Sequence, residues 1–114
     1  GASFVSRVFV GDIDLMVDVF KKAVMHRGFA LVEILAPCAT FSQEFNFNWF
    51  RQRVIPINKP FLKVEEAFRG AKQGKEKIPV GIFFQEERET FNNIASFKVN
   101  TSEADIKEVF KDFT

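Results

Sequence analysis

The stretch Gly28-Phe-Ala-Leu-Val-Glu-Ile-Leu-Ala-Pro-Cys-Ala-Thr40 decides the fold of this 114-residue chain. Residues 29–35 are apolar except for Glu33, and Gly28 and Pro37 bound this run. An apolar run of this length is too short for a membrane span and predicts a strand buried on both faces. Strands of that kind belong to parallel sheets that helices cover. The sequence therefore predicts an α/β fold built around this strand.

The residues before this strand predict its partner in the sheet. Residues 3–10 mix β-branched and aromatic side chains, which is typical of a strand. Asp12 or Asp14 is the expected N-cap of the helix that follows. In residues 13–26 apolar side chains recur at helical spacing, at Leu15, Met16, Val19, Phe20, Ala23 and Val24. Strand, helix and strand in this order predict a right-handed βαβ unit with two parallel strands.

Beyond Cys38 the sequence predicts shorter elements. They are, in order, a helix over the later half of residues 41–54, an extended connection over 56–60, a helix over 64–73, a strand over 78–84 and a last helix over 102–113. We expect Phe47, Phe50 and Val54 to share one face of the first of these helices. Pro79 indicates that the strand over 78–84 lies at a sheet edge or begins there.

The composition bounds the class of protein. A chain of 114 residues is long enough for a single domain with its own core. The net charge of +1 predicts neither a nucleic acid nor an anionic membrane as partner. No apolar stretch approaches the ~20 residues of a membrane span, and no secretory signal is visible. One cysteine excludes an internal disulfide and favours a reducing, cytoplasmic location.

The aromatic residues are almost wholly apolar, with 16 phenylalanines, one tryptophan and no tyrosine. We expect most of these rings to form the core. A domain of this size has difficulty hiding so many rings, however, so part of the set is expected to cover a partner surface.

Cys38 is the leading candidate for chemistry because it follows the carboxyl end of the apolar strand, where ligands gather in open α/β sheets. The alternative is a small apolar residue of the core. A catalytic Cys–His pair is not expected, because His26, the only histidine, ends the first helix at the opposite end of the βαβ unit. A metal site needs three or four ligands, so the others would have to come from outside this chain.

The other charged residues have structural interpretations. His26 is expected to cap a helix, and Glu33 to lie at a solvent edge of its strand or in an ion pair. Arg51, Arg53 and the lysines of residues 72–77 are expected to be solvated, with phosphate binding as the alternative. No Gly-rich phosphate loop, Gly-Asp-Gly motif or Ser/His/Asp series is present. Residue chemistry alone therefore leaves the function open.

Several blocks of the sequence resemble the carboxyl-terminal part of the β subunit of 2-oxoacid:ferredoxin oxidoreductases of the pyruvate and 2-oxoglutarate type. The blocks are Gly1-Ala-Ser-Phe-Val-Ser-Arg7 with Gly11-Asp12, His26-Arg-Gly-Phe-Ala-Leu-Val-Glu-Ile-Leu-Ala-Pro-Cys-Ala-Thr-Phe41, Asn48-Trp-Phe-Arg-Gln-Arg-Val54 and Lys77-Ile-Pro-Val-Gly-Ile-Phe-Phe-Gln-Glu-Glu-Arg88. They follow the family's order, and the second block is the most specific. The resemblance implies that residues 1–114 are a single α/β domain, the carboxyl-terminal portion of a thiamine-diphosphate-binding domain, with a short, mainly parallel sheet flanked by helices.

The family decarboxylates a 2-oxoacid oxidatively with coenzyme A and passes the electrons through thiamine diphosphate and a 4Fe-4S cluster to ferredoxin. The resemblance implies that Cys38 is the fourth cluster ligand in the full subunit and that Pro37, Ala39 and Thr40 shape its loop. The family's Gly-Asp-Gly motif for Mg²⁺ and the diphosphate, and its other cysteines, would precede residue 1. Ser42 stands where the family often has Asn. The chain alone is therefore expected to bind no thiamine diphosphate, Mg²⁺ or cluster and to be inactive.

The implied partners are the remainder of the β subunit, the α-, γ- and δ-type subunits, and ferredoxin. A sheet cut at this place would expose an apolar edge, which predicts a homodimer or poor solubility of the fragment. The alternative function is a non-catalytic interaction domain, with a Phe-rich partner face and Cys38 in its core. A thiol reagent separates the two, because a ligand loop should react and a core thiol should not.

Overall fold

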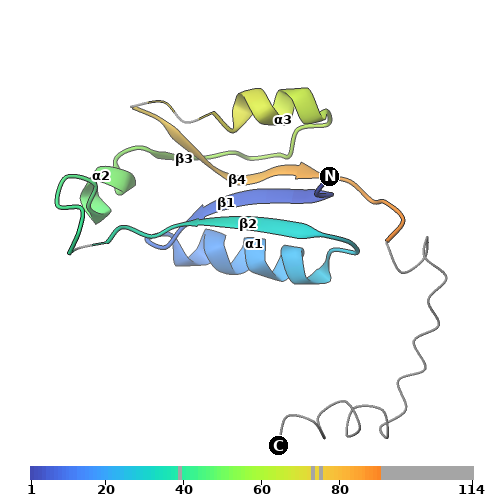
Figure 1. The fold of residues 1–114 in the computed structure, drawn as a ribbon, viewed down its shortest axis with the longest axis horizontal. Coiled ribbons are helices and arrows are strands. Elements are labelled where there is room, and N and C mark those ends of the chain that lie inside the picture. The colour runs from blue at the N-terminus through green and yellow to red at the C-terminus, as the bar shows by residue number, and fades with distance from the viewer. Residues whose placement is uncertain (39, 73, 75, 91–114) are drawn as a thin grey trace, which may run out of the picture.

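The structure, a computed structural model, describes residues 1–38, 40–72, 74 and 76–90. In these residues a four-stranded sheet with the order β2-β1-β4-β3 is flanked by helices (Figure 1). The elements are β1 (Phe4–Phe9), α1 (Ile13–Met25), β2 (Ala30–Leu35), α2 (Phe47–Arg51), β3 (Val54–Pro56), α3 (Val64–Gly70) and β4 (Ile78–Gln85). The β1–β2 and β3–β4 pairs are parallel, and the central β1–β4 pair is antiparallel. The predicted α/β class with mainly parallel pairing is therefore confirmed.

The βαβ unit predicted from the first 35 residues is present. β1 and β2 run parallel over their whole length, and α1 crosses between them. Asp12, and not Asp14, caps α1, because its carboxylate accepts the N–H of Leu15 at 3.1 Å. The chain then turns into β2 at Gly28, whose φ of +127° is a conformation that L side chains rarely adopt.

α1 and α3 lie on opposite faces of the sheet (Figure 1). Under α1, the buried side chains are Phe4, Val8 and Val19. Under α3, they are Ala67, Phe83 and Phe84. A three-layer arrangement of helix, sheet and helix therefore has a small core on each face of the sheet.

The prediction that the apolar strand is buried on both faces is wrong. β2 is an edge strand, and among the described residues only β1 pairs with it. Leu31 and Ile34 are 48% and 46% exposed, and Phe29 just before the strand is 67% exposed. The run is apolar enough for a central strand, but the described part of the chain does not supply its second neighbour.

Two boundaries differ from those predicted. α2 ends at Arg51, and Val54 begins β3 instead of continuing the helical face of Phe47 and Phe50. The reason is long-range pairing, because Val54 lies opposite Ile78 of β4. α3 ends at Gly70, three residues earlier than predicted.

The segment after β3 runs beside β4, which agrees with the extended connection predicted for residues 56–60. The N–H groups of Ile57 and Phe61 donate to the carbonyls of Val80 and Phe83, both at 2.8 Å. This close approach needs Gly81, because a Cβ at that position would lie 2.8 Å from the Ile57 side chain.

β4 lies between β1 and β3, so Pro79 marks the start of a strand and not a sheet edge. Pro79 is the second residue of β4 and lies opposite Ile55. The helix predicted over residues 102–113 lies outside the described residues. In the part of the chain that is described, no helix has both the length and the apolar character needed to cross a bilayer.

The core leaves many phenylalanines uncovered, as their number predicted. Phe4, Phe9, Phe83 and Phe84 are buried. The exposed ones include Phe20, Phe29, Phe41, Phe45, Phe47 and Phe68. That a partner covers some of these rings stays a prediction.

Candidate functional site

Cys38 lies in the loop that leads from the carboxyl end of β2 to α2, as the sequence predicted. The N–H of Val10 donates to the carbonyl of Leu35 at 3.1 Å, so this loop leaves the sheet beside the turn from β1 to α1. The Cys38 side chain is exposed and free. The alternative that placed it in the core is therefore wrong.

The Cys38 thiol accepts hydrogen bonds from two backbone N–H groups. The bond from Phe41, and after it the bond from Thr40, lowers the pKa of the Cys38 thiol below its ordinary value, against a smaller effect of desolvation. The N–H of Ser42 donates to the Cys38 carbonyl at 3.1 Å, which closes the turn. Because the thiolate is the form that binds metals and attacks electrophiles, this turn prepares Cys38 as a ligand or a nucleophile.

We expect the alkylation of Cys38 by iodoacetamide to have its pH midpoint below that of the same thiol in the unfolded chain. The lowered pKa means that the thiolate persists to lower pH in the folded state. Mass spectrometry of timed samples, in buffer and in concentrated urea, gives the two profiles. A short cysteine peptide measured in both solvents corrects for the effect of urea on the thiol. Equal corrected midpoints would show that the turn does not stabilise the thiolate.

An aromatic cluster holds α2 against the end of the sheet. Its members are Phe9 of β1 and the neighbouring residues Phe45, Phe47, Trp49 and Phe50. The ring centroid of Phe9, a residue only 1% exposed, lies 5.7 Å from that of Phe47 and 5.8 Å from that of Phe50. Such pairs contribute about 0.5–1.5 kcal/mol beyond their burial. The cluster therefore fixes the far end of the loop that begins at Cys38.

Short polar side chains order the loop between these two points. The Oγ of Ser42 accepts the N–H of Phe45 at 3.3 Å, and the Oδ1 of Asn46 accepts the N–H of Trp49 at 3.0 Å. Asn46 is thereby the N-cap of α2. Sequence analysis missed both hydrogen bonds, although the signal was present: each polar residue stands three positions before the N–H that it binds.

The basic residues predicted to be solvated differ in their surroundings, and phosphate binding by them stays a prediction. The prediction that Arg53 is solvated is wrong. Its guanidinium carbon lies 4.3 Å from the centroid of the Trp49 ring, and its Nη1 donates to the Trp49 carbonyl at 3.0 Å. Arg51, Lys72 and Lys77 are exposed, as predicted.

His26 lies at the opposite end of the βαβ unit from Cys38, so the two form no catalytic pair. His26 is the C-cap of α1, and its Nε2 lies 2.7 Å from the Oγ of Ser3. The length of β2, at about 3.3 Å per residue, separates it from Cys38 by roughly 20 Å. Both alternatives for Glu33 hold together, because its side chain is 49% exposed and is paired with Arg7.

Arg7 is the main residue that sequence analysis missed. Its side chain, 10% exposed, contacts Glu33 of β2 with Nε and Oε2 2.7 Å apart. Its Nη1 donates to the carbonyls of Ala71 at 3.0 Å and Pro79 at 3.3 Å, and its guanidinium carbon lies 5.2 Å from the Phe83 ring centroid. Arg7 thus joins β2, β4 and the end of α3. The signal was a charged residue in the middle of an apolar strand.

Cys38 fits one ligand of an iron–sulfur cluster but does not make a site by itself. Among the described residues no three His, Cys, Asp or Glu side chains are grouped to hold a metal ion. An exposed thiol with a lowered pKa and two N–H donors suits a cluster ligand, because such clusters are bound by thiolates and tuned by hydrogen bonds to sulfur. The remaining ligands would have to come from elsewhere.

Comparison with known proteins shows what this chain is similar to. Residues 38–99 match the family model for the carboxyl-terminal region of the pyruvate ferredoxin oxidoreductase beta subunit. The chain is 28% identical over 100 residues to a 2-oxoacid:ferredoxin oxidoreductase subunit beta of a Sulfolobus species, a match covering 76% of this chain and 33% of the relative. It is 30% identical over 105 residues to subunit beta of 2-oxoacid:ferredoxin oxidoreductase 2 of Aeropyrum pernix, covering 80% and 34%. The chain thus spans about a third of the length of these relatives.

The fold is similar to that of a solved 2-oxoglutarate:ferredoxin oxidoreductase from Magnetococcus marinus. The TM-score is 0.73 at 24% identity, and the match covers 97% of this chain and 41% of that chain. That structure was solved with 2-oxoglutarate, coenzyme A and succinyl-CoA bound. At this identity the likeness establishes the fold.

Proposed function

The chain belongs to the family formed by the carboxyl-terminal regions of pyruvate ferredoxin oxidoreductase β subunits, and from this membership we propose its function within an intact 2-oxoacid:ferredoxin oxidoreductase. The enzyme removes CO₂ from a 2-oxoacid such as pyruvate and joins the acyl group to coenzyme A. Ferredoxin accepts the two electrons released by this oxidation. The match over residues 38–99 begins at Cys38, the residue whose turn favours a thiolate.

Cys38 is proposed to hold one iron of a 4Fe-4S cluster that passes the electrons on. The observation that carries this role is the exposed turn, in which the N–H groups of Phe41 and Thr40 stabilise the thiolate. Pro37 restricts the backbone that enters the turn. When bound, thiamine diphosphate supplies the electron sink for the carbanion formed on decarboxylation.

The remainder of the β subunit is proposed to supply the other cluster ligands and the sites for thiamine diphosphate and Mg²⁺. Two observations support the proposal that these groups lie outside this chain. The described residues contain no grouped set of metal ligands, and β2 presents an unpaired apolar edge at which a longer sheet can continue. The remaining partners are the other enzyme subunits and ferredoxin, in the cytoplasm. The same edge supports a homodimer when the chain is isolated.

The test is purification of the protein from its source with an affinity tag on this chain, followed by intact mass and activity. We expect a mass well above the 13.1 kDa of this chain, or a complex of subunits, with ferredoxin reduction that requires both a 2-oxoacid and coenzyme A. Release of CO₂ with the same requirements is the control. A product of 13.1 kDa without other subunits and without this activity would overturn the proposal in favour of the interaction domain.

A further inference from the structure

The two edges of the sheet differ in their capacity to bind a further strand. Along the β3 edge, the carbonyl of Arg53 and the N–H groups of Ile57 and Phe61 bind β4. The prolines next to these bonded residues, Pro56 and Pro60, have no N–H and offer no donor to a strand outside the sheet. Prolines of this kind protect a sheet edge against further pairing.

The β2 edge has no such protection. The carbonyls of Phe29 and Leu35, at its two ends, accept N–H groups from β1 and from the residue after it. Because backbone groups alternate in direction along a strand, Ala30, Val32 and Ile34 direct their N–H and C=O groups away from β1. Among the described residues no strand lies on that side of β2. Three donors and three acceptors therefore form a template for a further strand.

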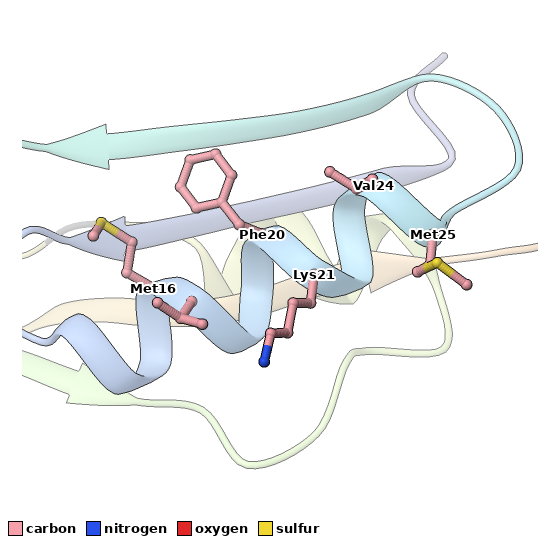
Figure 2. A pocket seen from close by; sticks show the side chains of 6 residues that line it. Met16, Phe20, Lys21, Val24 and Met25 are labelled. Carbon is pink, nitrogen blue, oxygen red and sulfur yellow. The ribbon is translucent and has the colours of Figure 1, made fainter.

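Apolar side chains accompany this edge on both faces of the sheet. Ile34 is half-exposed on the face that α1 covers, and Leu31 is half-exposed on the other face. Figure 2 shows Phe20 projecting from α1 on the side of β2. A hollow of about 450 Å³ beside α1 is lined by five apolar side chains and by Lys21. A strand at this edge would thus gain apolar contacts in addition to hydrogen bonds.

We propose that a second copy of the chain occupies this edge when the chain is isolated. The two β2 strands meet antiparallel about a two-fold axis beside Val32, which joins two four-stranded sheets into one continuous sheet. The inference rests on the proposed function in one respect, because in the intact enzyme the remainder of the β subunit would take the same edge.

A second copy fits because it brings an identical unprotected edge with identical apolar surroundings. A two-fold axis relates the two edges with donors facing acceptors only when the strands run antiparallel. Such a contact uses the same surface on both copies and closes at the dimer. Pairing of β2 with the β3 edge of another copy would instead continue into a filament, and Pro56 and Pro60 oppose it.

The outward backbone groups also select the register of the two strands. With the axis beside Val32, this residue lies opposite its own copy, and Ala30 lies opposite Ile34 of the partner subunit. All three outward residues of each strand are then paired. A register centred on Leu31 would leave Ile34 beyond the end of the partner's β2. A register centred on Glu33 would place two carboxylates directly opposite each other, which is destabilising.

The side chains agree with the register centred on Val32. On the face of α1 the bulky Ile34 meets the small Ala30 of the partner subunit. On the other face Leu31 meets Glu33 of the partner subunit. The Glu33 carboxylate is turned away from the edge, because Arg7 of the neighbouring β1 holds it at 2.7 Å. Its methylene groups therefore remain for contact with the leucine.

Disulfide trapping tests the proposal in the full 114-residue chain, with Cys38→Ser removing the native thiol. Val32→Cys places two thiols beside the axis, on Cα atoms about 5.5 Å apart, which a disulfide can bridge. Ile34→Cys is the matched control, because its two copies stand four residues out of register, about 13 Å along the strand. Mild oxidation is expected to link most of the Val32→Cys chains and few of the Ile34→Cys chains. Absence of linked Val32→Cys dimers, or equal linking of both variants, would overturn the proposal.

The mass in solution gives a second readout that does not depend on cysteines. Sedimentation equilibrium is expected to give twice 13.1 kDa for the unchanged chain and 13.1 kDa for Ile34→Lys, because a lysine on an edge strand opposes pairing. Ile55→Lys is the matched control on the β3 edge, where Ile55 is 41% exposed against 46% for Ile34, and it should stay dimeric. A monomeric unchanged chain, or equal effects of the two lysines, would contradict the proposed edge. Neither experiment measures activity, so the outcome is separate from that of the proposed function.

Discussion

Cys38→Ser in the intact enzyme is expected to abolish cluster-dependent reduction of ferredoxin. A serine hydroxyl stays protonated near neutral pH, whereas the Cys38 turn favours the thiolate that iron requires. Loss of a direct ligand should exceed the roughly 10–100-fold loss that changes around metal ligands cause. The measurements are the visible absorbance of the cluster and the rate of 2-oxoacid-dependent ferredoxin reduction, made on the same preparation.

Gln43→Ser is the matched control for this prediction. Gln43 is an exposed residue of the same loop, and its hydrogen bond to Asn46 uses its backbone carbonyl, which the substitution retains. The control should keep both the cluster absorbance and ferredoxin reduction. If Cys38→Ser also keeps them, Cys38 is not a cluster ligand and the proposed role is rejected.

Arg7→Met is expected to lower the free energy of unfolding by about 2–4 kcal/mol, because hydrogen bonds to a charged donor contribute roughly 1.5–3 kcal/mol. Methionine keeps much of the length and apolar packing but donates to neither the Ala71 nor the Pro79 carbonyl. The loss should stay below that for a fully buried pair, because Glu33 is half-exposed and regains water. Urea unfolding measures the change.

Two variants separate the parts of the Arg7 interaction. Glu33→Gln removes only the charge on the exposed side of the pair and should cost less than about 1 kcal/mol. Arg7→Lys keeps the charge, but an ammonium cannot reproduce the fork that contacts Glu33 and two carbonyls, so its cost should be intermediate. A free energy of unfolding unchanged in Arg7→Met would show that the buried arginine does not tie the strands together.

Local signals in the sequence determined the βαβ unit and the position of Cys38. The helical spacing of apolar residues, the short carboxylate of Asp12 and the stop at Gly28 each act within a few residues, so they define α1 closely. The strand that follows ends at Leu35, so Cys38 lies just beyond its carboxyl end. These features needed no information about distant parts of the chain.

Only the tertiary structure decided where each strand lies in the sheet and what surrounds each charged side chain. The residues after α2 pair with β4, which makes Val54 part of a strand, and β4 enters the middle of the sheet despite Pro79. β2 is left at the edge for the same reason. Pairing partners come from residues far apart in the chain, and local periodicity carries no information about them.

Arg7 and Cys38 show the same difference between what the sequence indicates and what the folded structure decides. The sequence indicates that Arg7 is unusual in its strand and that Cys38 follows another. The carbonyls that bind Arg7 come from the end of α3 and from β4, and the N–H groups that lower the pKa of Cys38 are aligned only when the turn closes. Residue type and local pattern thus fixed which groups are present, whereas their hydrogen bonds and charge state depend on atoms that only the folded chain brings together.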